Sequence, residues 1–170
     1  PCAFMDDYNP KTVFSSIDHH GRYAYNNQSS IIQWNLIRFA ESLLPLIHNK
    51  QDKAIKMAGE VINGFGEVYK KSWFKMMRNK IGLLNEEVED EKLINDLLSW
   101  MQKNKTDYTN AFCSLFEKDV LKNKFFQDGV FVDWHQRWLK RLKNNKQPIN
   151  ISLNIMRKTN PLIIPRNHRV

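Results

Sequence analysis

The sequence has few cysteines, glycines and prolines, and each scarcity excludes a class of protein. Only two cysteines, Cys2 and Cys113, occur in 170 residues. They are too few for a secreted disulfide scaffold, and their spacing does not match a zinc site. Six glycines and six prolines exclude collagen-like and low-complexity chains. We therefore expect a folded protein from a reducing compartment, with Cys113 as a small buried apolar residue.

Long apolar runs are also missing. The longest stretches, such as residues 43–47, fall far short of the ~20 residues that a membrane-spanning helix needs, and no signal-peptide pattern opens the chain. We expect a soluble protein without a membrane partner. Because Pro1 stands where an initiator Met would be and Val170 follows no tapering polar tail, we also expect a segment of a larger intracellular protein.

Charge is plentiful but unevenly distributed. Residues 1–100 contain 12 Lys and Arg against 13 Asp and Glu, whereas residues 101–170 contain 14 against 5. One hypothesis is a non-catalytic helical binding module whose basic face contacts nucleic acid. That face would include Lys140, Arg141, Lys143, Lys146, Arg157 and Lys158. The other interpretation, which we favour, is that lysine is the polar filler of exposed helices, so nucleic acid is not an expected partner.

Hydrophobic periodicity predicts a mostly α fold, and nothing resembles a βαβ alternation. Behind a cap at Ser29 or Ser30, apolar residues recur at three- and four-residue spacings, which predicts a helix with one buried face. This apolar stripe consists of Ile32, Leu36, Phe39, Ala40, Leu43, Leu44 and Ile47. A second apolar stripe follows Asp52 as far as Met77. We expect Gly64 or Gly66 to kink or split that second helix.

Four more helices are predicted towards the C-terminus. They run from the acidic stretch 86–91 through Leu93 to Met101, from Asp107 to Val120, from a cap near Asp133 with Trp134, Trp138 and Leu142 facing inward, and from Asn150 to Lys158. Pro161 and Pro165 then predict an extended tail. Residues 1–28 lack a helical period and are rich in turn formers and aromatics, which predicts an ordered loop.

Isolated chemistry is weak in this sequence. His19 and His20 beside Asp18 lack a third ligand at helical spacing, so a metal site is not expected there. Asp6 and Asp7 are more typical of a turn than of a Mg²⁺ site. Ser15-Ser16 lacks the glycine context of a nucleophile, and no glycine-rich phosphate loop occurs.

Several blocks nevertheless resemble the Selenoprotein O family, in order along the whole chain. They are Pro1-Cys2-Ala3-Phe4-Met5-Asp6, Ser15-Ser16-Ile17-Asp18, Gly21-Arg22-Tyr23, Asn27-Gln28, Trp34-Asn35-Leu36, Asp107-Tyr108-Thr109-Asn110, Asn160-Pro161 and residues 164–170. The resemblance is to the C-terminal half of these proteins. Ser29, where the family commonly has proline, and Cys113, where it often has arginine, depart from the pattern.

The resemblance implies a protein-kinase-like fold that transfers AMP from ATP to Ser, Thr or Tyr hydroxyls of proteins, with Mg or Mn. In this family the ATP-binding loop, lysine and arginines, the catalytic aspartate and both metal ligands precede the residue matching Pro1. We therefore expect the segment alone to be inactive, with no catalytic, cofactor-binding or metal residues. Its partners would be protein substrates and the missing N-terminal lobe, in the cytoplasm of a bacterium or the mitochondrion of a eukaryote.

The same resemblance divides the chain into an activation-segment-like loop at 1–28, a helical C-lobe domain at 29–159 and an extended tail at 160–170. Asp18, Arg22 and Tyr23 are the candidates for ordering the activation segment. The alternative, which we favour, is that these three residues only tie the loop to the C-lobe. Arg166 is left open between contacting an anion and pinning the tail to the helices.

Overall fold

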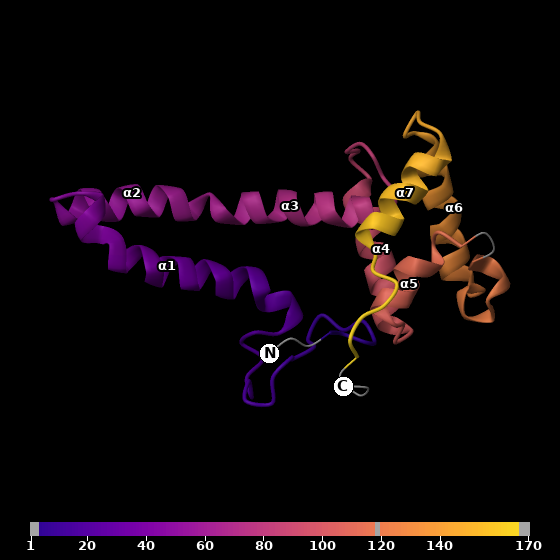
Figure 1. The fold of residues 1–170 in the computed structure, drawn as a ribbon, viewed down its shortest axis with the longest axis horizontal. Coiled ribbons are helices and arrows are strands. Elements are labelled where there is room, and N and C mark those ends of the chain that lie inside the picture. Colours follow the sequence, from indigo (N-terminus) through magenta and orange to yellow (C-terminus); the bar gives the residue numbers. More distant parts are fainter. Residues whose placement is uncertain (1–3, 118–119, 167–170) are drawn as a thin grey trace. The chain divides into compact units, whose positions relative to one another are not determined.

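The computed structural model describes residues 4–117 and 120–166, and these residues are mostly helical, with no strand among them (Figure 1). This confirms the predicted mostly α class. The α-helices are α1 (Gln28–Ile47), α2 (Gln51–Asn63), α3 (Phe65–Lys80), α4 (Asp90–Lys103), α5 (Tyr108–Ser114), α6 (Gly129–Lys143) and α7 (Ile149–Thr159). Short 3-10 helices cover Tyr25–Asn27, Val120–Lys122 and Lys124–Phe126. The parts of the family-like blocks at 1–3 and 167–170, including Cys2, lie outside the described residues.

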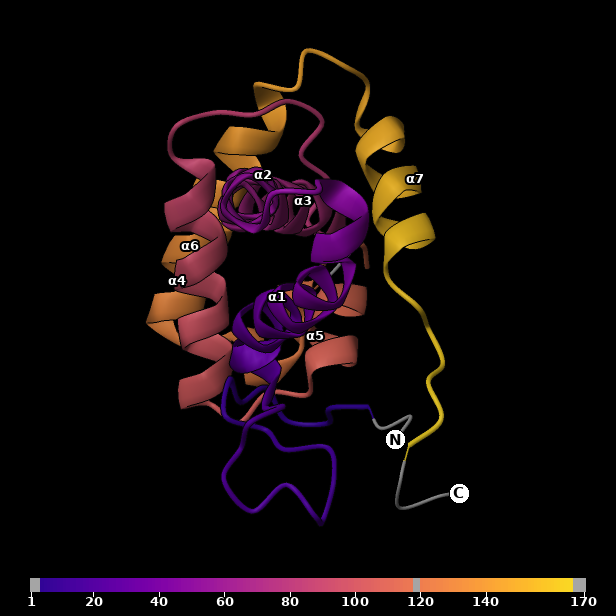
Figure 2. The same cartoon turned by 90° about the vertical axis from the view of Figure 1, so that its left-hand side faces the viewer.

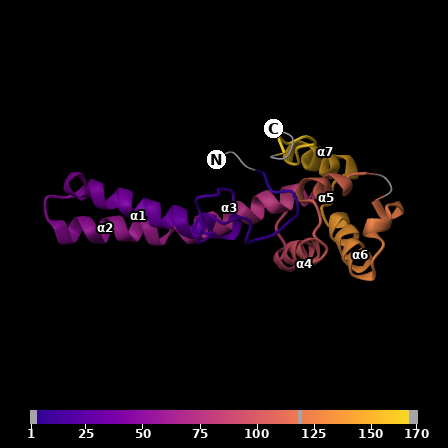
Figure 3. The same cartoon turned by 90° about the horizontal axis from the view of Figure 1, so that it is seen from below.

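The chain divides into two compact units, which we describe separately. The hairpin unit is Lys11–Trp73, and the core unit comprises Pro1–Pro10 and Phe74–Val170. In the hairpin unit α1 and α2 lie side by side (Figure 3), joined by a short link in which Lys50 N donates to His48 Nδ1 at 2.8 Å. The second predicted helix is split, because α2 ends at Asn63 with Gly64 as its C-cap, and α3 begins at Phe65.

The start and the buried face of α1 differ from the prediction. The helix begins at Gln28, directly after the 3-10 turn Tyr25–Asn27, so Ser29 and Ser30 already lie inside its first turn and cannot cap it. Ile31 is the buried residue of this helix, whereas Leu36 and Phe39 of the predicted buried stripe are exposed. The described residues of the hairpin unit therefore leave part of the stripe that the sequence pattern predicts to be buried exposed to solvent.

The core unit buries most of the apolar interior. Helices α4 and α6 lie side by side (Figure 2), and the predicted inward residues Leu93, Ile94, Leu97, Leu98, Met101, Trp134, Trp138 and Leu142 are all buried. The two indole groups are also satisfied as donors: Trp134 Nε1 donates to Leu93 O at 2.8 Å, and Trp138 Nε1 donates to Ile81 O at 2.8 Å. Cys113 is buried, as predicted.

Two predicted helix ends in this unit are wrong. Helix α6 is capped by Asp128 and not near Asp133, because the Asp128 carboxylate accepts hydrogen bonds from the Val130 and Phe131 amides and from the Trp100 indole. Helix α5 ends at Ser114 and not at Val120. There the bonding pattern shortens to three residues, with Glu117 N donating to Ser114 O at 3.1 Å.

Candidate functional site

A turn built on Asp18 orders the loop that precedes α1. The two carboxylate oxygens of Asp18 accept hydrogen bonds from the backbone N–H groups of Arg22 and Tyr23, both at 2.8 Å. Gly21 lies between Asp18 and Arg22 in the sequence and has a φ of +64°, a conformation that glycine adopts without the cost of a Cβ clash. The three residues that the sequence singled out thus come together in one turn, held by a carboxylate and not by regular secondary structure.

Arg22 connects this turn to α1. Its guanidinium carbon lies 4.3 Å from the centre of the Trp34 ring, and Arg38 of the same helix lies 5.5 Å from that ring. A cation over an exposed tryptophan face contributes about 0.5–1 kcal/mol. Gln28 Nε2 adds a hydrogen bond to Tyr23 O at 2.6 Å, while the Tyr23 side chain itself is exposed. The turn is therefore fastened to the start of α1 and presents a tyrosine to solvent.

A second cluster lies in the core unit and joins three segments that are distant in sequence. The Arg166 guanidinium donates to the carboxylates of both Asp6 and Asp107. Backbone bonds run beside it, from Tyr8 N to Thr106 O at 2.8 Å and from Tyr108 N to Asp6 O at 2.7 Å. The hydrogen bonds that Arg166 donates to Asp107 and Asp6 raise the pKa of Arg166 above its ordinary value, so this side chain stays cationic.

No pattern in the sequence indicates this cluster. The sequence leaves Arg166 open between an anion contact and a tail anchor, and the structure shows an anchor formed with two carboxylates of the same chain. Asp107 has two roles, since its Oδ1 also accepts from Asn110 N at 2.7 Å and caps α5. No periodicity relates positions 6, 107 and 166. The available signal was that all three stand in the family-like blocks.

Lys80 is a second residue that the sequence did not mark. It is buried at the end of α3, with its ammonium 4.3 Å from the centre of the Phe112 ring and 5.2 Å from that of Tyr108. Burial lowers the pKa of Lys80 to about 8, an effect that the nearby Cys113 thiol partly offsets. Burial also raises the pKa of Cys113. Near neutral pH this pair is a mostly protonated amine beside a thiol, which is not an activated nucleophile.

Two of the carboxylates that the sequence offers for a metal ion, Asp6 and Asp18, are engaged by protein donors. Asp6 accepts from Arg166, and both oxygens of Asp18 accept from backbone amides. Within residues 4–117 and 120–166, no group of three or more His, Cys, Asp and Glu side chains could hold a metal ion. These residues do not fit a Mg²⁺ site, which requires several oxygen ligands around one centre.

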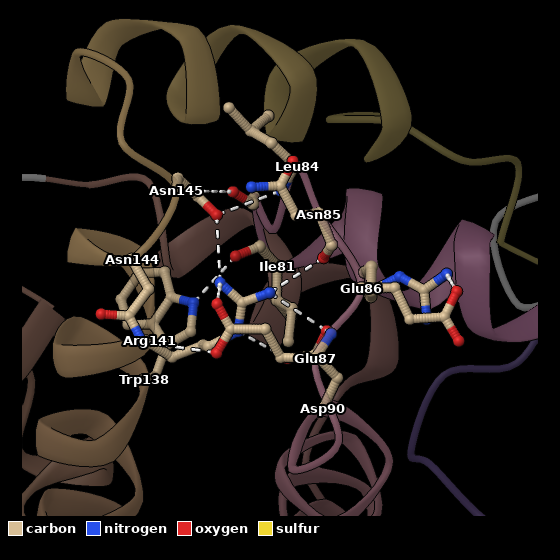
Figure 4. Close-up of polar contacts among 12 residues, drawn as sticks. Ile81, Leu84, Asn85, Glu86, Glu87, Asp90, Trp138, Arg141, Asn144 and Asn145 are labelled. Atoms are coloured by element: carbon tan, nitrogen blue, oxygen red, sulfur yellow. Dashed lines mark hydrogen bonds and ion pairs between the residues drawn. The ribbon is translucent and has the colours of Figure 1, made fainter.

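Arg141, one of the six cations of the nucleic-acid hypothesis, is withdrawn from solvent. Figure 4 shows its guanidinium among Asp90, Asn145, Glu87 and the Asn85 carbonyl, with Nε donating to Asp90 Oδ1 at 2.7 Å. The side chain is 7% exposed. A buried and paired guanidinium is not available for a phosphate, so the proposed basic face loses this member.

In the part of the chain that the structure describes, no helix is both long and apolar enough to cross a membrane. Helix α1 does not meet both conditions either, although its 20 residues carry only two charged side chains, Arg38 and Glu41.

Comparisons with known proteins place the chain in one family over its whole length. The family model described as "Protein adenylyltransferase SelO" matches residues 1–170. Proteins named "Protein nucleotidyltransferase YdiU" from Nitrosococcus oceani, Alkaliphilus metalliredigens and Pelagibacter ubique are 52%, 51% and 48% identical over 170 residues. All of this chain is covered, but only 34–35% of each relative. The chain thus spans about a third of the length of the curated relatives it matches.

Proposed function

The chain belongs to the protein adenylyltransferase SelO family, and we propose that it is the C-terminal part of an enzyme that transfers AMP from ATP to Ser, Thr or Tyr hydroxyls of proteins. The observation that carries the proposal is the match of the family model to every residue from 1 to 170. Relatives named nucleotidyltransferases, about 50% identical over the same residues, support it. The full-length protein is the polypeptide that carries these residues together with the additional length of its relatives.

In the proposed reaction a substrate hydroxyl oxygen forms a bond to the α-phosphorus of ATP, and the bond from that phosphorus to the bridging oxygen of pyrophosphate breaks. The hydroxyl proton leaves to a base, and pyrophosphate departs. Such transfers depend mainly on positioning the nucleophile and neutralising phosphate charge. We assign the groups that bind ATP and Mg or Mn to the part of the full-length protein outside these 170 residues.

We assign a supporting role to the present segment, as the helical C-lobe of a kinase-like fold. Residues 1–28 would form the activation-segment-like loop, 29–159 the helical domain and 160–170 the tail. The hydrogen bonds of Asp18 and the contact of Arg22 with Trp34 support a loop of fixed shape. A fixed loop is what a protein substrate needs in order to place its hydroxyl repeatedly in one position. A bacterial full-length protein is expected in the cytoplasm, and a eukaryotic one in the mitochondrion.

The position of the ATP label separates this reaction from phosphoryl transfer. The full-length protein is incubated with an acceptor protein, Mg²⁺ or Mn²⁺, and ATP that carries the radiolabel in either the α- or the γ-phosphate. We expect label on protein from α-labelled ATP only, because AMP retains the α-phosphate. Labelling from γ-labelled ATP would identify a kinase, and labelling from neither would contradict the proposal.

A further inference from the structure

The hairpin unit has an apolar groove that its own residues do not fill. The groove has a volume of about 580 Å³ and lies between α1, α2 and the start of α3. Its lining contains no charged side chain, and includes Leu36, Phe39 and Leu43 of α1 and Met57, Val61 and Val68 of α2 and α3. Phe39 is 61% exposed and Val61 is 78% exposed. Groups of exposed large apolar side chains of this kind mark interaction surfaces.

The interior of the hairpin unit is too small to explain its fold. Among its described residues only three apolar side chains are buried, namely Ala24, Ile31 and Ala54. Two are alanines, and the large side chains Leu43, Leu44, Ile47, Ile62 and Phe65 are only partly covered. A unit of 63 residues, Lys11–Trp73, has to offset about 1 kcal/mol or more of backbone entropy per ordered residue. Further apolar surface must be covered by something else.

The composition of α1 supports the same conclusion. Its only charged residues, Arg38 and Glu41, pair with each other at 2.6 Å, and its regular apolar stripe is the one that the sequence predicts to be buried. A helix with so few charges is typical of the interior of a larger protein and not of a solvent-facing hairpin.

We propose that this groove is the docking site for an apolar segment from the part of the full-length protein outside residues 1–170, packed there within the same molecule. The relatives carry about two thirds of their length outside the matched region, which provides ample chain to supply such a segment. Covalent connection gives that segment a high effective concentration at the groove, which a second copy or a transient substrate lacks. A permanent, charge-free contact also fits an intramolecular interface better than a reversible one.

The inference rests on the proposal that these residues are part of a longer enzyme, but not on the chemistry of that enzyme. Photo-crosslinking in the full-length protein tests it. Benzoylphenylalanine replaces Val61 or Phe39, and a control probe replaces Ile55, which is an exposed apolar residue of α2 outside the groove lining. We expect both groove probes to crosslink to peptides from outside residues 1–170, in a product that has the mass of one molecule. The Ile55 probe should not form this product.

Crosslinks at twice the molecular mass, crosslinks confined to residues 1–170, or equal yields from the Ile55 probe would overturn the inference. Thiol labelling gives a second readout that does not depend on the large probe. In the folded full-length protein, maleimide should not label the thiol introduced by Val61→Cys but should label the thiol introduced by Ile55→Cys. Full labelling of both variants would also overturn it. AMP transfer is assayed on the same samples, so loss of transfer with the crosslinks intact would count against the proposed function alone.

Discussion

Arg141 of α6 and Asp90 of α4 form a buried two-pronged ion pair across 51 positions of sequence: Nε donates to Oδ1 at 2.7 Å and Nη2 donates to Oδ2 at 3.2 Å. Asp90 is 1% exposed. The remaining donors of Arg141 contact Asn145 and the Asn85 carbonyl (Figure 4), and Asp90 also accepts from Glu87 N at 2.9 Å. The pair therefore holds the loop before α4 against α6.

Removing one partner of this pair should strongly destabilise the chain. We expect Arg141→Ala to lower the free energy of unfolding by about 3–5 kcal/mol, because it leaves the Asp90 carboxylate buried without its cation. Arg137→Ala is the matched control on the same helix. Arg137 pairs with Asp96 and Asp133 at the surface, where such pairs contribute only about 0–1 kcal/mol. Urea unfolding followed by tryptophan fluorescence measures both, and equal losses would contradict this account.

Gly82 should not accept a side chain. It follows the end of α3 and has a φ of +75°. Gly82 N donates to Asn79 O and Leu83 N donates to Arg78 O, the paired bonds of a Schellman motif. A Cβ at this position would lie 2.8 Å from Met156 Sδ. We expect Gly82→Ala to cost about 1–3 kcal/mol of unfolding free energy.

Gly59→Ala in the interior of α2 is the control for Gly82→Ala. Nothing lies within 4 Å of a Cβ added at Gly59. Because alanine favours a helix over glycine by about 1 kcal/mol, this substitution should be neutral or stabilising. The midpoint temperature of thermal unfolding is measured for both variants. A Gly82→Ala variant as stable as the parent chain would show that the turn is not constrained.

Lys80 should destabilise the fold at neutral pH, and the effect should fade as the pH rises. The pKa of Lys80 is about 8 in the folded chain against an ordinary value of 10.5. Below pH 8 both states are protonated and the burial penalty is complete. Between pH 8 and 10.5 the unfolded chain holds the proton that the folded chain has lost, so stability rises with pH in this window.

We therefore expect Lys80→Met to raise the free energy of unfolding at pH 7, by at most about 3 kcal/mol, and to lose this advantage between pH 8 and 10.5. Denaturant titrations of the parent chain and the variant across this range measure the difference. An advantage that stays constant with pH would contradict the assignment of a lowered pKa to Lys80.

The Asp18 turn should depend on the carboxylate. We expect Asp18→Ala to accelerate hydrogen exchange at the Arg22 and Tyr23 amides, because it removes both of their acceptors. In the full-length protein the same change should reduce AMP transfer while leaving the α-helices protected. Asp52→Ala, in the first turn of α2 of the same unit, is the control and should leave both readouts unchanged. Unchanged exchange at Arg22 and Tyr23 would contradict the role given to Asp18.

The sequence predicted what depends on local pattern. The stripe Leu93, Ile94, Leu97 defined α4 because a 3.6-residue period is set within one helix. The break at Gly64 followed from a local glycine. Caps were less predictable, since Asp128 and Asp133 are equally suitable by residue type. Asp128, the one that caps the helix, also accepts a hydrogen bond from Trp100, 28 residues away, and no local pattern indicates this contact.

Long-range polar contacts could not be predicted from the sequence. The ion pairs of Arg166 with Asp6 and Asp107 and of Arg141 with Asp90 join distant segments, and their formation depends on tertiary packing. The exposed stripe of α1 is a case in which the helix could be predicted but its burial could not. Its period correctly marks a helix, but burial depends on what packs against it, and the sequence of these residues alone does not contain that information.

We propose that residues 1–170 support the active site of an adenylyltransferase without containing it. Intact-protein mass spectrometry tests it most directly, after the chain and the full-length protein are incubated in parallel with ATP, Mg²⁺ or Mn²⁺ and an acceptor protein. We expect an AMP adduct on protein with the full-length protein and none with the chain alone. Adducts formed by the chain alone would contradict the claim that catalysis lies elsewhere, and adducts from neither would contradict the proposed transfer itself.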